Sequence, residues 1–292
     1  MATGVSDEED TRADPPVPSI AEFRHRSEMP MVALTVGIMV ALLAVVIAIG
    51  VLLGSEQVGK VFALAAVLLP NSAAFALGRW RYWTTISQGV EVTADQLPDV
   101  YEVFVAQATA MGMTRSRGRD RLPQLYVING QGKLSASAAK ETLFRAYVVV
   151  SSDLLDAAGA GGGDPTSLQF VLARELGHIK AGHLANWRRA LMPVANLLFI
   201  GRSVSRAQEY TADRMACYYV PDGITIVMAL YAGQNVYSRV DLDAYIASLH
   251  SLHSRFWLPL ANLFQDSPVG FRRMQALART RTEGWDVHGR ML

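Results

Sequence analysis

Residues 171–183 read VLARELGHIKAGH, and this stretch decides how the rest of the chain is interpreted. Asp164 and Pro165 precede it and form a good helix start, with an N-cap acceptor and a proline in the first turn. We therefore expect a helix over residues 166–187 with the stretch at its centre. It differs by one residue from the pattern His-Glu-x-x-His, because Arg174 stands at the first histidine position.

The pattern His-Glu-x-x-His is a metal-binding pattern. Residues four apart share one face of a helix, so two histidines at this spacing grip one zinc ion while the neighbouring glutamate activates a water molecule. A catalytic zinc site also needs a third protein ligand from elsewhere. Residues 205–216, SRAQEYTADRMA, offer one on a second expected helix, where Glu209 and Asp213 lie four residues apart.

The two segments carry a family resemblance. RELGHIKAGH (174–183) and SRAQEYTADRMA (205–216) together resemble the membrane zinc metallopeptidases of the HtpX and CAAX-prenyl-protease kind, which are glutamate zincins. The resemblance covers about residues 95–280. It implies an α+β fold, namely a mainly helical zincin-like catalytic domain, and zinc as the cofactor.

The resemblance also implies roles for individual residues. Glu175 would be the general base, and His178 and Glu209 would be zinc ligands. Asp213 would be a carboxylate that orients the first histidine, as the outer partners of metal ligands do. That histidine is the one replaced by Arg174.

Two further segments depart from the family pattern. The family often has His-Pro where this chain reads DSPVGFRRMQAL (266–277), with Ser267. A stretch resembling Asn-Ala-Phe-Ala before the active helix is replaced by LSASAA (134–139).

Arg174 changes the chemistry of the expected site. Its guanidinium stays protonated and has no lone pair for a metal, so it opposes a zinc ion at this place. We predict that it pairs with Glu209 or Asp213 and neutralises carboxylates that zinc would otherwise neutralise. An alternative is a poor metal site formed by Glu175, His178 and Glu209, which would occupy the general base.

Other candidate ligands are weaker. His183 lies five residues after His178, about 140° around a helix, so the two do not easily face one ion. His250 and His253 are spaced like a surface or capping pair. The single cysteine, Cys217, excludes an internal disulfide framework and is expected to be a small buried apolar residue.

Before the domain lie two apolar runs. Residues 30–54 contain no charge and match a bilayer core of ~30 Å, so they predict a transmembrane helix. Residues 61–78 reach about 27 Å, just enough to span, and a re-entrant or interfacial segment is the alternative. RWRYW (79–83) favours spanning, since Trp, Tyr and Arg settle at the headgroup level.

These runs set the expected organisation. We expect a disordered tail over residues 1–29, a transmembrane hairpin over 30–83 and a metallopeptidase-like domain over 84–292. The positive-inside rule puts both termini and the large domain in the cytoplasm, because the basic residues flank the hairpin on its outer ends: Arg24, Arg26, Arg79 and Arg81. The protein would then be an integral protein of the plasma membrane.

Within the domain, residues 95–113 show helical spacing, and residues 124–129 and 146–155 are rich in the residues that strands favour. The glycine-rich segment 158–164 has no Gly-Lys-Ser/Thr after it, which favours a flexible connector over a phosphate loop. Two short apolar segments interrupted by proline predict core or membrane-surface packing: 191–200 and 256–264.

Three functions fit these features. The first is a membrane-anchored zinc endopeptidase acting on membrane-associated or damaged proteins, and the second is a pseudopeptidase that binds extended peptides or partners as an adaptor or regulator. The third is a structural domain with a buried arginine–carboxylate network. The expected partners are a protein or peptide substrate and the membrane; the net charge of +1 gives no support for nucleic-acid binding.

Overall fold

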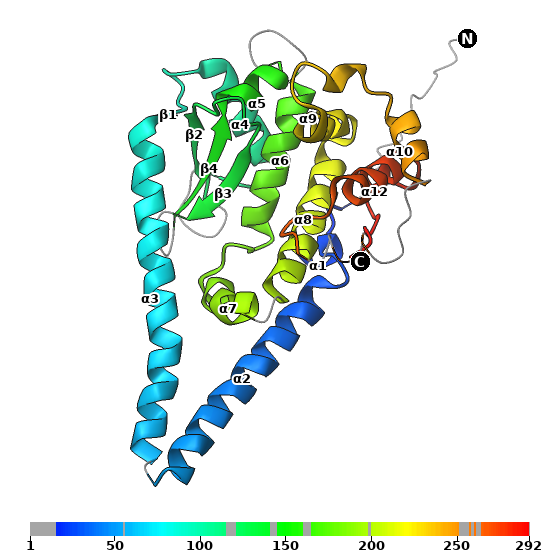
Figure 1. Cartoon of the computed structure of the whole chain (residues 1–292). Helices are drawn as coiled ribbons and strands as arrows, with labels where there is room; N and C mark the ends of the chain where they lie inside the picture. Colours follow the sequence, from blue (N-terminus) through cyan, green and yellow to red (C-terminus); the bar gives the residue numbers. More distant parts are fainter. Residues whose placement is uncertain are drawn as a thin grey trace, which may run out of the picture.

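The computed structural model of the chain describes residues 16–54, 56–114, 121–140, 145–159, 165–197, 200–250, 257, 260 and 264–291. It has a mainly helical α+β domain with a small sheet, and two long helices project from it (Figure 1). The α+β class and its helical bias are therefore confirmed.

The projecting helices are α2 (Glu28–Leu52) and α3 (Glu56–Gln88). Both are long and apolar enough to cross a membrane, and most of their large apolar side chains are exposed. They meet at their far end, where a Cβ on Gly59 would lie 2.9 Å from the Cα of Gly50. Helix α3 is longer than expected, because it passes residue 83 and continues to the sheet.

The segment before α2 packs against the domain. The sequence places residues 16–29 in a disordered tail, whereas the structure forms α1 (Ile20–Phe23) and buries Phe23. The Phe23 ring centroid lies 5.3 Å from that of Tyr218 and 4.8 Å from that of Trp285. A single short turn gives no periodicity, so its packing was not visible in the sequence. Residues 1–15 lie outside the described residues.

The sheet has four strands in the order β1-β2-β4-β3: β1 (Gly89–Glu91), β2 (Gln124–Ile128), β3 (Ala136–Lys140) and β4 (Ala146–Ser151). Strands β2 and β4 are parallel, and β3 forms an edge antiparallel to β4. Both expected strands are present, but the second ends early and is followed by α5 (Ser152–Ala157). The edge strand β3 falls in the LSASAA segment, which did not predict a strand.

Helix α6 (Thr166–Lys180) lies at the centre of the domain. It packs on the sheet and against four helices: α4 (Pro98–Ala110), α8 (Ile200–Tyr219), η1 (Pro221–Thr225) and α9 (Ile226–Ala232). The domain also contains the helices α7 (Asn186–Leu197), η2 (Tyr237–Arg239), α10 (Leu242–His250) and α12 (Gly270–Glu283). Phe170, Leu172 and Leu176 are fully buried, and each contributes about 1.5–3 kcal/mol by leaving water. The expected helix over 166–187 ends early, because Gly182 takes a φ of +70°.

Candidate functional site

The candidate site lies where α6 packs against α8. Arg174, Glu175 and His178 come from α6, and Glu209 and Asp213 come from α8. Nε2 of His178 lies 3.6 Å from Oε1 of Glu209, and Nε of Arg174 lies 3.4 Å from Oδ1 of Asp213. The structure thus brings together all the residues that the sequence predicted for the site.

Arg174 is paired with all the carboxylates around it. Its guanidinium donates hydrogen bonds to Glu175 and to Glu209 and forms an ion pair with Asp213. Burial alone would lower the pKa of Arg174, but the charges of Glu209, Glu175 and Asp213 raise it above its ordinary value. The side chain therefore stays positively charged, and the predicted pairing of Arg174 with Glu209 and Asp213 is present in the structure.

Glu209 is held in its charged form. Burial would raise the pKa of its carboxyl, but the nearby charge of Arg174 and the contact with His178 lower it to about 2. Glu209 is thus a carboxylate at neutral pH, and Arg174 is the principal cation that compensates it.

Asp213 has a second arginine partner that the sequence did not reveal. Nε and Nη2 of Arg273, from α12, donate to its two carboxylate oxygens, each at 2.7 Å. This bidentate pair is buried, with side-chain exposures of 5% for Arg273 and 4% for Asp213. Arg273 lies in the DSPVGFRRMQAL segment, where no spacing rule separates it from Arg272.

The histidines next to the site form a contact that the sequence did not predict. Nδ1 of His183 lies 2.9 Å from Nδ1 of His178, although the helical angle placed the two residues on different faces. The angle does not apply, because α6 ends before His183 and the turn at Gly182 brings the ring back. Burial lowers the pKa of His178 to about 4, so its ring is neutral at pH 7.

These residues do not fit a zinc ion as they are arranged. Within the described part of the chain, no group of three or more His, Cys, Asp or Glu side chains could hold a metal ion. Glu209, which would serve as a ligand, is instead paired with Arg174, and Asp213 is paired with Arg273. The predicted zinc ligands His178 and Glu209 are adjacent, but a guanidinium takes the place of the third donor.

The remaining candidates lie outside this cluster. His253 and the side chain of His250 lie outside the described residues. Cys217 is buried, and burial raises the pKa of its thiol to about 12, in line with the expected small buried residue.

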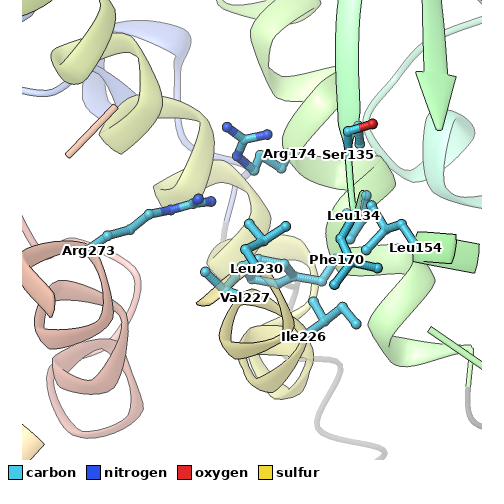
Figure 2. A pocket seen from close by; sticks show the side chains of 11 residues that line it. Leu134, Ser135, Leu154, Phe170, Arg174, Ile226, Val227, Leu230 and Arg273 are labelled. Atoms are coloured by element: carbon cyan, nitrogen blue, oxygen red, sulfur yellow. The ribbon is translucent and has the colours of Figure 1, made fainter. Parts of the chain in front are cut away.

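A pocket of about 220 Å³ opens beside the cluster. Arg174 and Arg273 approach it from α6 and α12, and its other side is mostly apolar (Figure 2). The apolar lining comes from β3 and the chain before it, from α5, from α6 and from α9: Leu134, Ala136, Leu154, Phe170, Val171, Ile226, Val227 and Leu230. The pocket therefore combines a charged end with an apolar wall next to the edge strand of the sheet.

Residues 95–200 match the sequence model of Peptidase family M48. The match supports the resemblance of this part of the chain to M48 metallopeptidases. It includes Arg174, Glu175 and His178 of the M48-like helix α6 but ends before Glu209 and Asp213. No curated protein and no solved structure is significantly similar to the chain.

Proposed function

We propose that this protein is a membrane-anchored pseudopeptidase of the M48 metallopeptidase family that binds extended peptide segments of other proteins. The observation that carries the proposal is the position of Arg174, whose guanidinium is bonded to Glu175 and Glu209 and paired with Asp213. The α2–α3 hairpin supports the anchoring by its length and composition.

The electrostatics of the cluster support a role that does not depend on zinc. A zinc ion among these carboxylates would add a double positive charge beside a guanidinium that already pairs with them. To admit it, Arg174 would have to leave three acidic partners, Glu175, Glu209 and Asp213, and remain charged nearby. The side chain of Glu175 is only 2% exposed and forms a hydrogen-bonded ion pair with Arg174, so it is not free to act as a general base.

The peptide-binding part of the proposal rests on the edge strand and the pocket. Among the strands that the structure describes, β3 pairs with β4 alone, so its other edge can take an added strand. The pocket lined by Leu134, Phe170 and Leu230 lies beside it and suits an apolar side chain of such a strand. The expected ligand is therefore an extended peptide with at least one large apolar residue.

A second candidate is a zinc-dependent endopeptidase near the inner face of the plasma membrane, acting on membrane-associated or damaged proteins. The match with Peptidase family M48 favours it, as does the presence of Glu175, His178 and Glu209. The arrangement of Arg174 argues against it. The two candidates differ in peptide-bond hydrolysis, whereas both require peptide binding.

The test combines binding and hydrolysis on the full chain in detergent. Fluorescent extended peptides with and without a large apolar residue are titrated by anisotropy, and their cleavage is followed by mass spectrometry. We expect saturable binding of the apolar peptide without cleavage. Leu230→Asp should weaken this binding at least tenfold, because it puts a charge at the pocket wall.

Val236→Asp is the matched control, since Val236 is also an exposed apolar residue but does not line the pocket. Cleavage of the peptide by the parent, abolished by a chelator, would instead establish the endopeptidase. Absence of binding would contradict both candidates and leave a structural role.

A further inference from the structure

Helix α7 exposes several apolar side chains. Its buried positions are Arg188, Leu191 and Ala195. Its exposed or half-buried positions carry six apolar residues and three polar ones: Trp187, Ala190, Met192, Pro193, Val194 and Leu197, and Asn186, Arg189 and Asn196. Trp187 is 51% exposed and Leu197 is 74% exposed. Arg189 is the single charged residue among these positions, whereas the exposed face of a helix in water normally carries mostly charged and polar residues.

The charged residue of the buried face has a structural reason to point inward. Nη1 of Arg188 donates to Oε1 of Glu28 at 2.7 Å, and both side chains are nearly inaccessible to water. The Arg188 guanidinium also lies 5.1 Å from the centre of the Trp187 ring. The ion pair thus fixes the rotation of α7 and leaves the exposed apolar side chains facing out.

Helix α7 lies in the opening between α2 and α3, at the end of the domain from which they project (Figure 1). Leu191 packs against Val32 in α2, and a Cβ on Gly78 in α3 would lie 3.1 Å from Nη2 of Arg189. Val32 and Gly78 lie at the ends of the two apolar runs that are nearest to the domain. Helix α7 therefore lies at the same height as the ends of the two candidate membrane spans that are nearest to the domain.

We propose that the outward face of α7 contacts the lipid bilayer at its headgroup boundary, with Trp187 and Leu197 in the membrane interface. This inference rests on the proposed membrane anchoring. A lipid surface is favoured over a protein partner because the face continues the exposed apolar surfaces of α2 and α3 at the same level. Exposed Trp80 and Trp83 follow Gly78 in α3, as expected for aromatic residues at this boundary.

The test uses nitroxide labels on the full chain in nanodiscs of phosphatidylcholine and phosphatidylglycerol. Cys217 is 3% exposed, so single added cysteines can be labelled selectively. Ala190→Cys and Leu197→Cys probe α7. Leu42→Cys on the exposed side of α2 reports anchoring, and Glu102→Cys on α4 reports water. Accessibility to oxygen is compared with accessibility to a water-soluble nickel chelate.

We expect oxygen to relax the labels at 42, 190 and 197, and the nickel chelate to relax the label at 102. Preference for nickel at 190 and 197, with oxygen preference at 42, would overturn the inference and leave the anchoring intact. Shielding of 190 and 197 from both agents would overturn it in favour of a protein that covers α7. Nickel preference at 42 would overturn the anchoring and this inference together.

Discussion

Helix α8 carries a buried arginine–carboxylate cluster on each of two faces, and the two clusters differ in charge balance. The site cluster consists of Glu175, Glu209 and Asp213 with Arg174 and Arg273, and it borders the pocket. The anchor cluster consists of Glu28 with Arg24, Arg188, the ring of His183 and the hydroxyl of Thr211, and it joins α2 to the domain.

The balance indicates what each cluster does. Glu28 is completely buried, and its carboxylate has more positive than negative charge around it, with Thr211 Oγ1 donating at 2.6 Å. Such a closed cluster ties the hairpin to the domain. The site cluster has more carboxylates than guanidinium groups, and Glu209 keeps 20% of its side chain exposed. Its three carboxylates and two guanidinium groups leave it with a net negative charge.

The largest effect is expected in the anchor cluster. Glu28→Ala leaves Arg188 buried without its carboxylate partner and should lower the free energy of unfolding by about 3–5 kcal/mol. Chemical denaturation in detergent measures this change. Glu22→Ala, at an exposed position of the same segment, should change stability by less than about 0.5 kcal/mol. Equal losses of stability in the two variants would show that the anchor cluster does not hold α2 on the domain.

Removing the guanidinium of the site cluster should cost less. Arg174→Ala leaves Glu209 and Glu175 without their shared guanidinium partner, but water can reach Glu209. We therefore expect the free energy of unfolding to fall by about 2–4 kcal/mol. Arg202→Ala on α8 is the control, because its ion pair of 3.7 Å is with an exposed aspartate, Asp266. A variant at 174 as stable as the parent would contradict the role given to Arg174.

A smaller effect is expected at Asp213. Arg273→Lys keeps the positive charge but replaces the two parallel hydrogen bonds by a single point charge, which should cost about 1–2 kcal/mol. Thermal unfolding of the variant beside Arg272→Lys checks this, since Arg272 is the neighbouring arginine and does not pair with Asp213. No difference between them would mean that the bidentate geometry is unimportant.

The smallest effect is a dependence on pH. Burial lowers the pKa of His178 to about 4 in the folded protein, while an unfolded chain binds the proton near the ordinary value of 6.5. Stability should therefore fall as the pH drops from about 6.5 towards 4, and His178→Gln should reduce this slope. Unfolding midpoints of parent and variant across this range give the difference. A parallel decline in the two proteins would contradict a neutral, buried His178.

The sequence predicted the parts of this comparison that depend on regular spacing. Arg174, Glu175 and His178 on one helix, and Glu209 and Asp213 on another, are fixed by helical geometry and by the motif that they resemble. The membrane candidates were visible as long uncharged runs, because length and composition suffice for that prediction.

What the sequence did not reveal depends on tertiary contacts. Arg273 meets Asp213 only through the packing of α12 on α8. Glu28 meets Arg188, which lies 160 residues later in the chain, only through the packing of α2 on α7. Strand β3 consists of small residues with little strand preference and is fixed by its pairing with β4. The contact of His183 with His178 was not predicted, because it depends on where α6 ends.

The most direct test of the account is the zinc content of the purified full chain beside Arg174→His, with Arg202→His as a control for the added histidine. The account predicts no bound zinc in the parent and the control, and about one zinc ion per chain in Arg174→His, since the variant restores the pattern His-Glu-x-x-His. Stoichiometric zinc in the parent, measured by elemental analysis after dialysis, would contradict the claim that Arg174 takes the place of the metal.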